Sequence, residues 1–375
     1  MKNAYSWLLL LISFTAGAQM NWSEGEYASF STLRSGIHKI NGTTLINQGV
    51  LGEGDQLDRL VILHRPEGEL PHINGLSNGG LQPTYYKVVD SDGMLDANSL
   101  VLFYVNAPYV MEFKDSTYSY SEHSYSEREY FIISALPTSS NQHMMEQDRA
   151  LVSNARAIHL VTQFHVVDSA HTNLVGTGRR WFGDLFDFTT QRPYNLPLSA
   201  APNTSIDIKV NAVARANSST TKLEILDGGS VSFPSVGTSS VADYVTERAL
   251  HSDVPAGSGL NAVVLNYDKA GNSNAAMWLD KLVVNYWANL DYQPSATYQK
   301  RYQNFPRGAG NFSTFEVSTA TPQSLHVFEL RPGGEVRDVQ PNFGTSNVSW
   351  SAPEDTLLQY LVVSTNDAFV PRFER

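Results

Sequence analysis

Ile206-Asp207-Ile208-Lys209-Val210-Asn211-Ala212 is the stretch that decides the fold, because apolar and polar side chains alternate along it. Successive side chains of a β-strand point to opposite faces of a sheet, so this period of two predicts a strand with one buried and one wet face. Leu223 and Ile225 alternate with Lys222 and Glu224 in the same way. We therefore expect β-sheet throughout this part of the chain.

Short apolar runs extend the β-pattern to the rest of the sequence. Gly, Asn, Asp and Pro bound these runs, which is typical of more deeply buried strands between turns. The runs cover residues 60–63, 100–104, 262–267, 282–287 and 357–363, and turns are expected at Asn41-Gly42, Asp92-Gly93, Asp227-Gly228-Gly229 and Gly333-Gly334. The segment 144–157 lacks Gly and Pro and is a candidate helix. The fold class we predict is all-β, with tandem β-sandwich or jelly-roll-like domains.

The beginning of the chain has the three parts of a secretory signal peptide. Lys2 gives a positive start, residues 7–14 are an apolar run too short to span a bilayer, and Ala16-Gly17-Ala18 supplies small residues for cleavage before Gln19. A short buried helix is the alternative for this segment. We expect residues 1–18 to be removed on export, and we find no later run of 18 uncharged apolar residues.

Breaks in composition near residues 137–148, 173–180 and 289–296 divide the mature chain. We predict an N-terminal β-domain over residues 24–175 and a jelly-roll-like β-sandwich over residues 180–290. A third β-region over residues 296–375 looks incomplete, because its last residues show no turn, cap or polar tail; a short solvated terminus is the alternative.

The composition limits the chemistry of the chain. It contains no cysteine, which excludes disulfides, Cys-ligated zinc, iron–sulfur clusters and a thiol nucleophile within these residues. The formal net charge is −11, and loss of Lys2 with the signal peptide makes it −12. Such an acidic chain is not expected to bind nucleic acid.

One turn has the oxygen ligands of a possible calcium site. Asp90, Asp92, Asp96 and Asn98 surround Gly93, and a hard cation such as Ca²⁺ takes six to eight oxygens from a folded-back loop. The spacing is not that of a full EF-hand, so a polar hairpin turn is the alternative. No other cofactor is expected.

A second group has the residue types of a transition-metal site. His165, Asp168 and His171 are spaced by three residues, which suits neither one face of a strand nor a helical pair. Solvated loop side chains are the alternative for these residues.

Several strings together resemble one known family. Asn173-Leu174 precedes Gly176-Thr177-Gly178-Arg179-Arg180-Trp181-Phe182-Gly183-Asp184, a block similar to one in the N-terminal region of the PorU-type sortases. These sortases belong to type IX secretion systems and are related to gingipain-type cysteine peptidases. Weaker matches follow in the same order at residues 36–40, 73–80, 92–104, 125–131 and 278–285, the last of which contains Asp280.

The resemblance implies structural roles for the matched residues. Trp181 and Phe182 are expected in a sandwich core or in a joint between domains, and Asp280 is expected to hold a turn. Arg179 or Arg180 is expected to pair with Asp184 or Asp187. Thr177 and Asp184 replace the family's usual Ser and Glu, which are mild changes.

The resemblance also implies a function for the region. The family's His and Cys dyad lies in a C-terminal peptidase domain beyond everything matched, so no catalytic residue is carried over. The expected role is a structural or docking region of a sortase that processes the C-terminal sorting domains of cargo and attaches cargo to the cell surface. Implied partners are the absent peptidase domain, cargo sorting domains and outer-membrane components such as a PorV-like barrel. The implied location is the outer-membrane surface or periplasm of a Bacteroidota-type bacterium.

Two other function classes stay open at this point. An exported carbohydrate-binding or surface-adhesion β-sandwich would need two or three exposed, coplanar aromatic rings on one sheet face, for which Trp181, Trp278 and Trp287 are candidates. An independent enzyme is the other class, although no set of nucleophile and base can be named.

Overall fold

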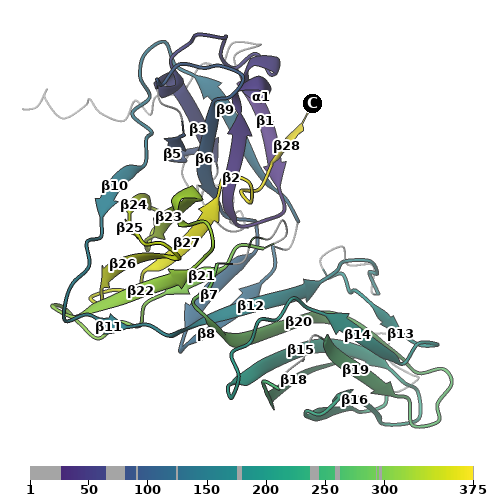
Figure 1. Ribbon diagram of the computed structural model, residues 1–375. Coiled ribbons are helices and arrows are strands. Elements are labelled where there is room, and N and C mark those ends of the chain that lie inside the picture. Colours follow the sequence, from purple (N-terminus) through teal and green to yellow (C-terminus); the bar gives the residue numbers. More distant parts are fainter. Residues whose placement is uncertain are drawn as a thin grey trace, which may run out of the picture.

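The computed structural model describes residues 27–64, 81–89, 92–123, 126–174, 180–236, 245–257, 262–292, 294 and 298–374, and the expected signal peptide lies outside these ranges. The predicted all-β fold class is confirmed, because strands dominate and the helical elements are short (Figure 1). Within the described ranges, no helix has the length and apolar character needed to cross a bilayer. The strands form three units, which we call the first, second and third β-units.

The first β-unit packs two sheets around Phe30, whose ring stacks on Phe131 at 5.1 Å. The sheet orders are β28-β1-β9-β3-β4 and β2-β6-β5, and the β7–β8 hairpin extends from the unit. Its elements are β1 (Tyr27–Thr32), β2 (Gly36–Asn41), α1 (Gly42–Asn47), the 3₁₀ helix η1 (Leu57–Arg59), β3 (Leu60–His64), β4 (Gln82–Pro83), β5 (Tyr86–Val88), β6 (Leu100–Val105), β7 (Val110–Lys114), β8 (Thr117–Ser121), β9 (Glu129–Ala135) and β28 (Arg372–Glu374).

The second β-unit is a sandwich whose sheets have the orders β12-β20-β15-β18 and β14-β19-β16-β17, while β13 pairs with β20. The alternation that starts at Ile206 works as predicted, because the apolar set is buried in the sandwich and Asp207, Lys209 and Asn211 are not. Its strands are β12 (Leu160–Asp168), β13 (Leu185–Phe186), β14 (Gln191–Asn195), β15 (Ser205–Arg215), β16 (Thr221–Ile225), β17 (Ser230–Phe233), β18 (Thr246–Pro255), β19 (Ala262–Asp268) and β20 (Ala276–Asn289).

The third β-unit has the sheet orders β10-β24-β23-β27-β21 and β11-β22-β26-β25 around the buried ring of Trp350. Its elements are β10 (Met145–Asp148), β11 (Arg156–Ala157), β21 (Arg301–Gln303), β22 (Phe312–Ser318), the 3₁₀ helix η2 (Pro322–Ser324), β23 (Leu325–Leu330), β24 (Val336–Gln340), β25 (Asn342–Phe343), β26 (Asn347–Pro353) and β27 (Gln359–Ser364). Strand pairing therefore distributes residues 145–168, which we grouped with the N-terminal region, over the second and third units.

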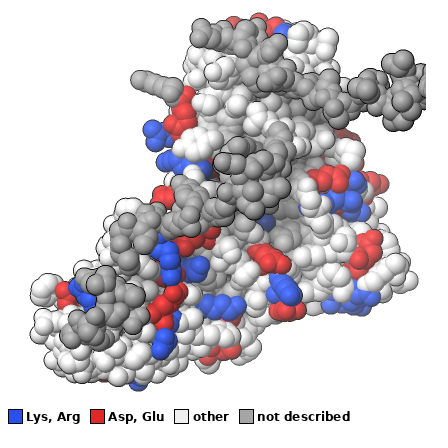
Figure 2. Space-filling view, turned by 180° about the vertical axis from the view of Figure 1, so that it is seen from behind, with Lys and Arg blue, Asp and Glu red and all other residues white. Residues whose placement is uncertain are grey.

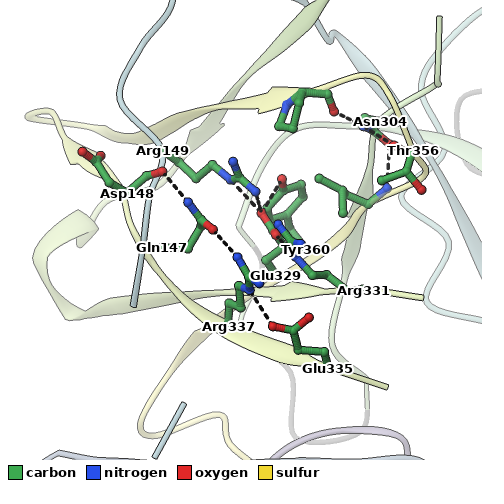
Figure 3. A network of polar contacts seen from close by, with 12 residues as sticks. Gln147, Asp148, Arg149, Asn304, Glu329, Arg331, Glu335, Arg337, Thr356 and Tyr360 are labelled. Carbon is green, nitrogen blue, oxygen red and sulfur yellow. Dashed lines mark hydrogen bonds and ion pairs between the residues drawn. The ribbon is translucent and has the colours of Figure 1, made fainter. Parts of the chain in front are cut away.

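The candidate helix over residues 144–157 was wrong, because this segment forms β10 and β11 instead. Two fully buried carboxylates of the third unit, Glu329 and Glu354, pair with Arg149 and Arg156 of this segment and hold it extended. Arg149 reaches Glu329 at 2.6 Å, and Glu329 also accepts from Arg331 and from the Tyr360 hydroxyl (Figure 3). These partners lie far away in sequence, so helix propensity within the segment does not predict the outcome.

The turn expected at Asn41-Gly42 was also wrong, because these residues begin helix α1. The Asn41 side chain caps the helix by accepting from the Thr44 N–H at 2.9 Å. Gly42 lies against the main chain at Asp96, where an added Cβ would meet the carbonyl oxygen. Asn is favoured both in turns and as a helix cap, so the dipeptide alone does not separate the two.

Glu354 gives a direct test of how the third unit is held together. Burial would raise the pKa of its carboxyl, but hydrogen bonds from Ser313, Arg307 and Arg156 keep the pKa below its usual range. A lowered folded pKa stabilises the fold above the ordinary carboxyl pKa, and this stability is lost as the pH falls.

We expect Glu354→Gln to lower the free energy of unfolding by about 2 kcal/mol at pH 7, because the buried side chain loses charge-assisted hydrogen bonds from Ser313, Arg156 and Arg307. The difference from the unchanged protein should shrink below about pH 4. Urea unfolding measures both values. The control is Glu335→Gln, which removes a half-exposed partner of Arg337 and should cost less than about 1 kcal/mol. Equal losses in the two variants would contradict the assignment.

Candidate functional site

The residues of the strongest family string lie where β12, β13 and β20 meet, although Gly178 and Arg179 are outside the described residues. Phe182 is buried with Val213 and Trp278, and Leu174 packs on the edge of this cluster beside the half-buried Asn173. The expected burial of Phe182 is therefore confirmed. Trp181 is 46% exposed and lines a cleft between the units, so it is not in the sandwich core.

Gly183 shows why the string needs a residue without a side chain. Its N–H donates to the Leu279 carbonyl at 2.7 Å, and an added Cβ would lie 2.8 Å from the Ser169 carbonyl oxygen. Real Cβ contacts are longer than this, so only glycine permits the close approach of these strands.

The expected pairing of Arg179 or Arg180 with Asp184 or Asp187 is not made by Arg180, and Arg179 lies outside the described residues. The Arg180 guanidinium donates to Glu247 at 2.8 Å and lies 3.6 Å from Asp280. Asp184 instead accepts from the Tyr194 hydroxyl, and Asp187 pairs with Lys269. The partners of Arg180, Glu247 and Asp280, come from β18 and β20, which adjoin the loop only in the folded protein.

Asp280 lies inside β20 rather than at a turn. The pairing of β15 with β20 shifts register there, so that Asn211 faces Lys281 while Ala212 faces Leu279. Asp280 is the extra residue of this β-bulge, which redirects its side chain. Burial raises the pKa of the Asp280 carboxyl, although the nearby Arg180 acts in the opposite direction.

Two of the proposed calcium ligands, Asp92 and Asp96, accept hydrogen bonds from their own turns. Asp92 accepts from the Met94 N–H at 2.9 Å, and Asp96 accepts from the N–H groups of Asn98 and Ser99 at 2.7 Å. Asp90 lies outside the described residues, so calcium binding stays a prediction.

The three residues considered for a transition metal take separate positions. His165 stacks on Tyr286, Asp168 accepts from the Tyr120 hydroxyl at 2.6 Å, and His171 is exposed. A group that the sequence did not indicate is Asp207, His251 and Asp253, whose ligand atoms lie within 4.8 Å of one another. Only the pairing of β15 with β18 brings it together, and Lys209 already contacts Asp207 at 3.1 Å.

Several polar contacts between units are made by side-chain carboxamides that pair with main-chain groups. Asn285 of β20 accepts from the Tyr118 N–H at 2.8 Å and donates to the Tyr118 carbonyl at 3.0 Å. Both residues are fully buried. The Asn285 amide thus replaces a neighbouring strand for β8, and it joins the first unit to the second.

Two glutamines act in the same way. Gln163 of β12 accepts from the Arg301 N–H and donates to its carbonyl, which joins the second unit to the third. Gln299 accepts from the Ile37 N–H at 2.7 Å and donates to its carbonyl at 2.9 Å, which joins the third unit to the first. We call these three amide–backbone pairs the carboxamide joints.

Gly36 is required beside the third of these joints. Its φ of +148° is a conformation that residues with a side chain rarely adopt, and an added Cβ would clash with the Gln299 amide. Two main-chain hydrogen bonds between β2 and Phe369 continue the same contact.

The three units enclose a cleft of about 940 Å³. Arg34 and Tyr120 of the first unit, His165 and Trp181 of the second, and Gln299 and Arg301 of the third line it. His165 and Tyr120 already serve internal contacts, so the exposed Trp181 ring and the Arg301 guanidinium are the groups best placed to meet a ligand. The arrangement suits binding at the junction of the units.

Sequence reasoning missed the carboxamide joints and Arg301. Asn285 gave a usable signal, because it is a polar residue inside an apolar run, and a buried amide requires hydrogen-bond partners. No comparable signal marks Gln163, Gln299 or Arg301, since polar residues are ordinary in loops and next to other polar residues.

The tryptophans do not form the platform that sugar binding would need. Trp278 is 6% exposed, and Trp287 is half-buried with its ring 5.8 Å from that of Phe305. Of the three candidates, Trp181 alone is exposed, so the condition set for the carbohydrate-binding alternative is not met.

No protein-family model and no curated protein matches the chain. Among solved structures, dimeric latent PorU from Porphyromonas gingivalis aligns over 93% of this chain and 33% of that chain, with a TM-score of 0.70 and 17% identity. The chain therefore spans about a third of PorU, and at this identity the likeness shows a shared fold.

Two further solved structures align poorly. BuGH86 in complex with neoagarooctaose aligns over 70% of this chain and 32% of its own, with a TM-score of 0.22 and 10% identity. The mosquito-larvicidal Cry4Aa toxin from Bacillus thuringiensis aligns over 62% and 43%, with a TM-score of 0.19 and 13% identity. These scores are too low to indicate a shared arrangement.

The Asn285 joint can be tested by deleting its amide. We expect Asn285→Ala to lower the free energy of unfolding by about 2–4 kcal/mol, because the Tyr118 N–H and C=O are left buried without partners. The control is Asn211→Ala on the neighbouring strand, which should change it by less than about 0.5 kcal/mol. Equal stability of the two variants in urea would contradict the role of Asn285.

We expect the stability of the fold to depend on pH through the buried His38, which lies near Gly36 in β2. Burial lowers the pKa of its imidazole to about 4, although its hydrogen bond to the Gly36 carbonyl opposes this. A folded pKa below the ordinary 6.5 means that stability is full above pH 6.5 and is lost as the pH falls toward 4.

We expect the loss of stability between pH 7 and pH 5 to be about 2 kcal/mol smaller in His38→Gln than in the unchanged protein. Urea unfolding at the two pH values gives the comparison. Replacing the exposed His159 by Gln serves as the control and should leave the loss unchanged. The same loss in His38→Gln and the unchanged protein would refute the assignment.

Proposed function

We propose that this chain is the non-catalytic N-terminal β-region of a PorU-like type IX secretion sortase. The observation that carries the proposal is the fold shared with PorU over 93% of the chain. The ordered family strings support it, because Gly36, Gly183, Asp280 and Asn285 all take positions in them where the fold allows few alternatives.

The region would act as a rigid platform rather than as the source of the reaction. Transpeptidation through a thioester needs a cysteine nucleophile, and these residues contain none. A peptidase domain following residue 375 would leave from β28, which pairs with β1 at the edge of the first unit. The carboxamide joints would then hold three β-units in fixed positions against that domain.

The same proposal names partners and a location. Partners would be the C-terminal peptidase domain, cargo sorting domains and outer-membrane components such as a PorV-like barrel. The signal peptide would take the region across the inner membrane, and its site of action would be the outer-membrane surface or periplasm of a Bacteroidota-type bacterium.

Deletion of the gene in its source bacterium tests the proposal. We expect cargo proteins to keep their C-terminal sorting domains and to be lost from the cell surface, as read by mass spectrometry of surface and culture fractions. A copy of the intact gene should restore processing, and a copy lacking the codons for residues 27–374 should not. Normal cargo processing in the deletion strain would contradict the proposal.

The DNA after codon 375 gives an independent check. The proposal expects the reading frame to continue into a domain with a His and Cys pair. A stop codon followed by an unrelated gene would contradict the assignment as part of a sortase.

A further inference from the structure

The β7–β8 hairpin exposes main-chain groups along one edge. Asp115 and Ser116 have φ values of 50° and 65°, which is the conformation of a type I′ two-residue turn. Lys114 and Thr117 close this turn, so hydrogen-bonded pairs alternate along the hairpin from there. The N–H and C=O groups of Met111 and Phe113 on β7 therefore point away from β8, as do those of Tyr118 on β8.

Within the described ranges, the outward main-chain groups have hydrogen-bond partners at one edge of the hairpin but not at the other. On β8, both outward groups of Tyr118 are taken by the Asn285 amide. On β7, the outward groups of Met111 and Phe113 have no hydrogen-bond partner among the residues that the structure describes. A strand with open N–H and C=O groups is a template on which another strand can add.

A groove of about 320 Å³ runs along this open edge. Residues 110–113 of β7 line it, and so does the turn from Arg331 to Val336. Gly333 and Gly334 at the centre of that turn have open space beside them, so no side chain fills the groove from that side. The groove shares Ser35, Tyr109 and Arg301 with the larger cleft, and the two are therefore continuous.

Arg301 places a positive charge in the groove without a described counter-ion. Its guanidinium donates to the Gln359 amide oxygen at 3.0 Å and to the Tyr104 hydroxyl at 3.2 Å, which are both neutral. Within the described residues, no carboxylate lies within 4.0 Å of it. Lys87, Arg149 and Lys300 are partly buried cations that each face an acidic side chain, whereas Lys39 donates to main-chain carbonyls. A cation removed from water is costly unless an anion pairs with it.

The other charged residues that line the groove do not serve as a counter-ion for Arg301. Arg331 pairs with Glu329, and Glu335 pairs with Arg337. Glu112 lines the groove but is exposed, so water screens its charge. On the face shown in Figure 2, many basic and acidic side chains lie near one another.

We propose that this groove binds an extended acidic peptide segment of another protein. The segment adds as a strand to β7, and its backbone pairs with the outward groups of Met111 and Phe113. A carboxylate of the segment pairs with the Arg301 guanidinium in the bidentate geometry that arginine favours. The inference rests on the hairpin, the groove and Arg301, and it does not depend on the proposed sortase role.

A synthetic peptide tests the proposal with the full chain. The probe is a fluorescein-labelled, acetylated Thr-Val-Glu-Val-Thr-Val, and its binding is followed by fluorescence anisotropy. Replacing Glu by Gln in the peptide should weaken binding at least tenfold, because the charge-assisted bond is lost. Methylating alternate backbone nitrogens should abolish binding, because strand addition needs those donors.

Variants of the protein distinguish the ion pair with Arg301 from the backbone pairing with β7. Arg301→Gln should weaken binding of the Glu peptide at least tenfold but leave that of the Gln peptide unchanged. Arg248→Gln is the matched control, since it removes an exposed charge on the second unit. Met111→Pro removes an outward N–H without touching the bonds to β8, and should weaken both peptides with little change in melting temperature.

Several results would overturn the proposal. These are no binding of the Glu peptide up to about 1 mM, equal binding of the Glu and Gln peptides, or unchanged binding in both Arg301→Gln and Met111→Pro. Full binding of the backbone-methylated peptide would also overturn it. Melting curves identify a variant that fails to fold, and the other variant and the two altered peptides then decide the outcome.

Discussion

Side-chain carboxamides that pair with main-chain N–H and C=O groups determine how the three β-units of this protein sit relative to one another. An amide offers a donor and an acceptor in one plane, as a peptide group does, so it completes the hydrogen bonding of a strand that has no neighbour. Asn285, Gln163 and Gln299 each do this for one residue of another unit. The pairs are neutral, so they avoid the cost of burying charge.

Apolar and ionic contacts support these joints without replacing them. Between the first and third units, Ile37 and Leu102 pack with Phe328 and Leu361. Lys87 of the first unit pairs with Asp338 of the third at 2.7 Å. Such contacts bring the surfaces together but allow sliding, whereas an amide that pairs with one residue permits one register. The groove beside β7 and the central cleft both exist because the units are fixed in this way.

The sequence predicted what depends on local pattern. The period of two from Ile206 identified a strand of the sandwich with its correct faces, and the turn at Gly333-Gly334 formed as expected. The sequence did not predict what depends on distant partners. Residues 144–157 took the extended form because Glu329 and Glu354, far along the chain, hold Arg149 and Arg156.

The candidate site was predictable only in part. The string around Trp181 and Phe182 marked a place where strands meet, and Phe182 was buried as expected. Arg301 carried no sequence signal, because its importance comes from what surrounds it. Its neutral partners, Tyr104 and Gln359, lie on strands of two different units. Charge imbalance of this kind is a property of the fold and not of any segment.

Calorimetry tests the central claim that the carboxamide joints make the three units one cooperative body. We predict a single unfolding transition for the unchanged protein, with equal calorimetric and van't Hoff enthalpies. Separate transitions are expected when Asn285, Gln163 and Gln299 are all replaced by Ala. Separate transitions in the unchanged protein, or a single cooperative transition in the triple variant, would contradict this claim.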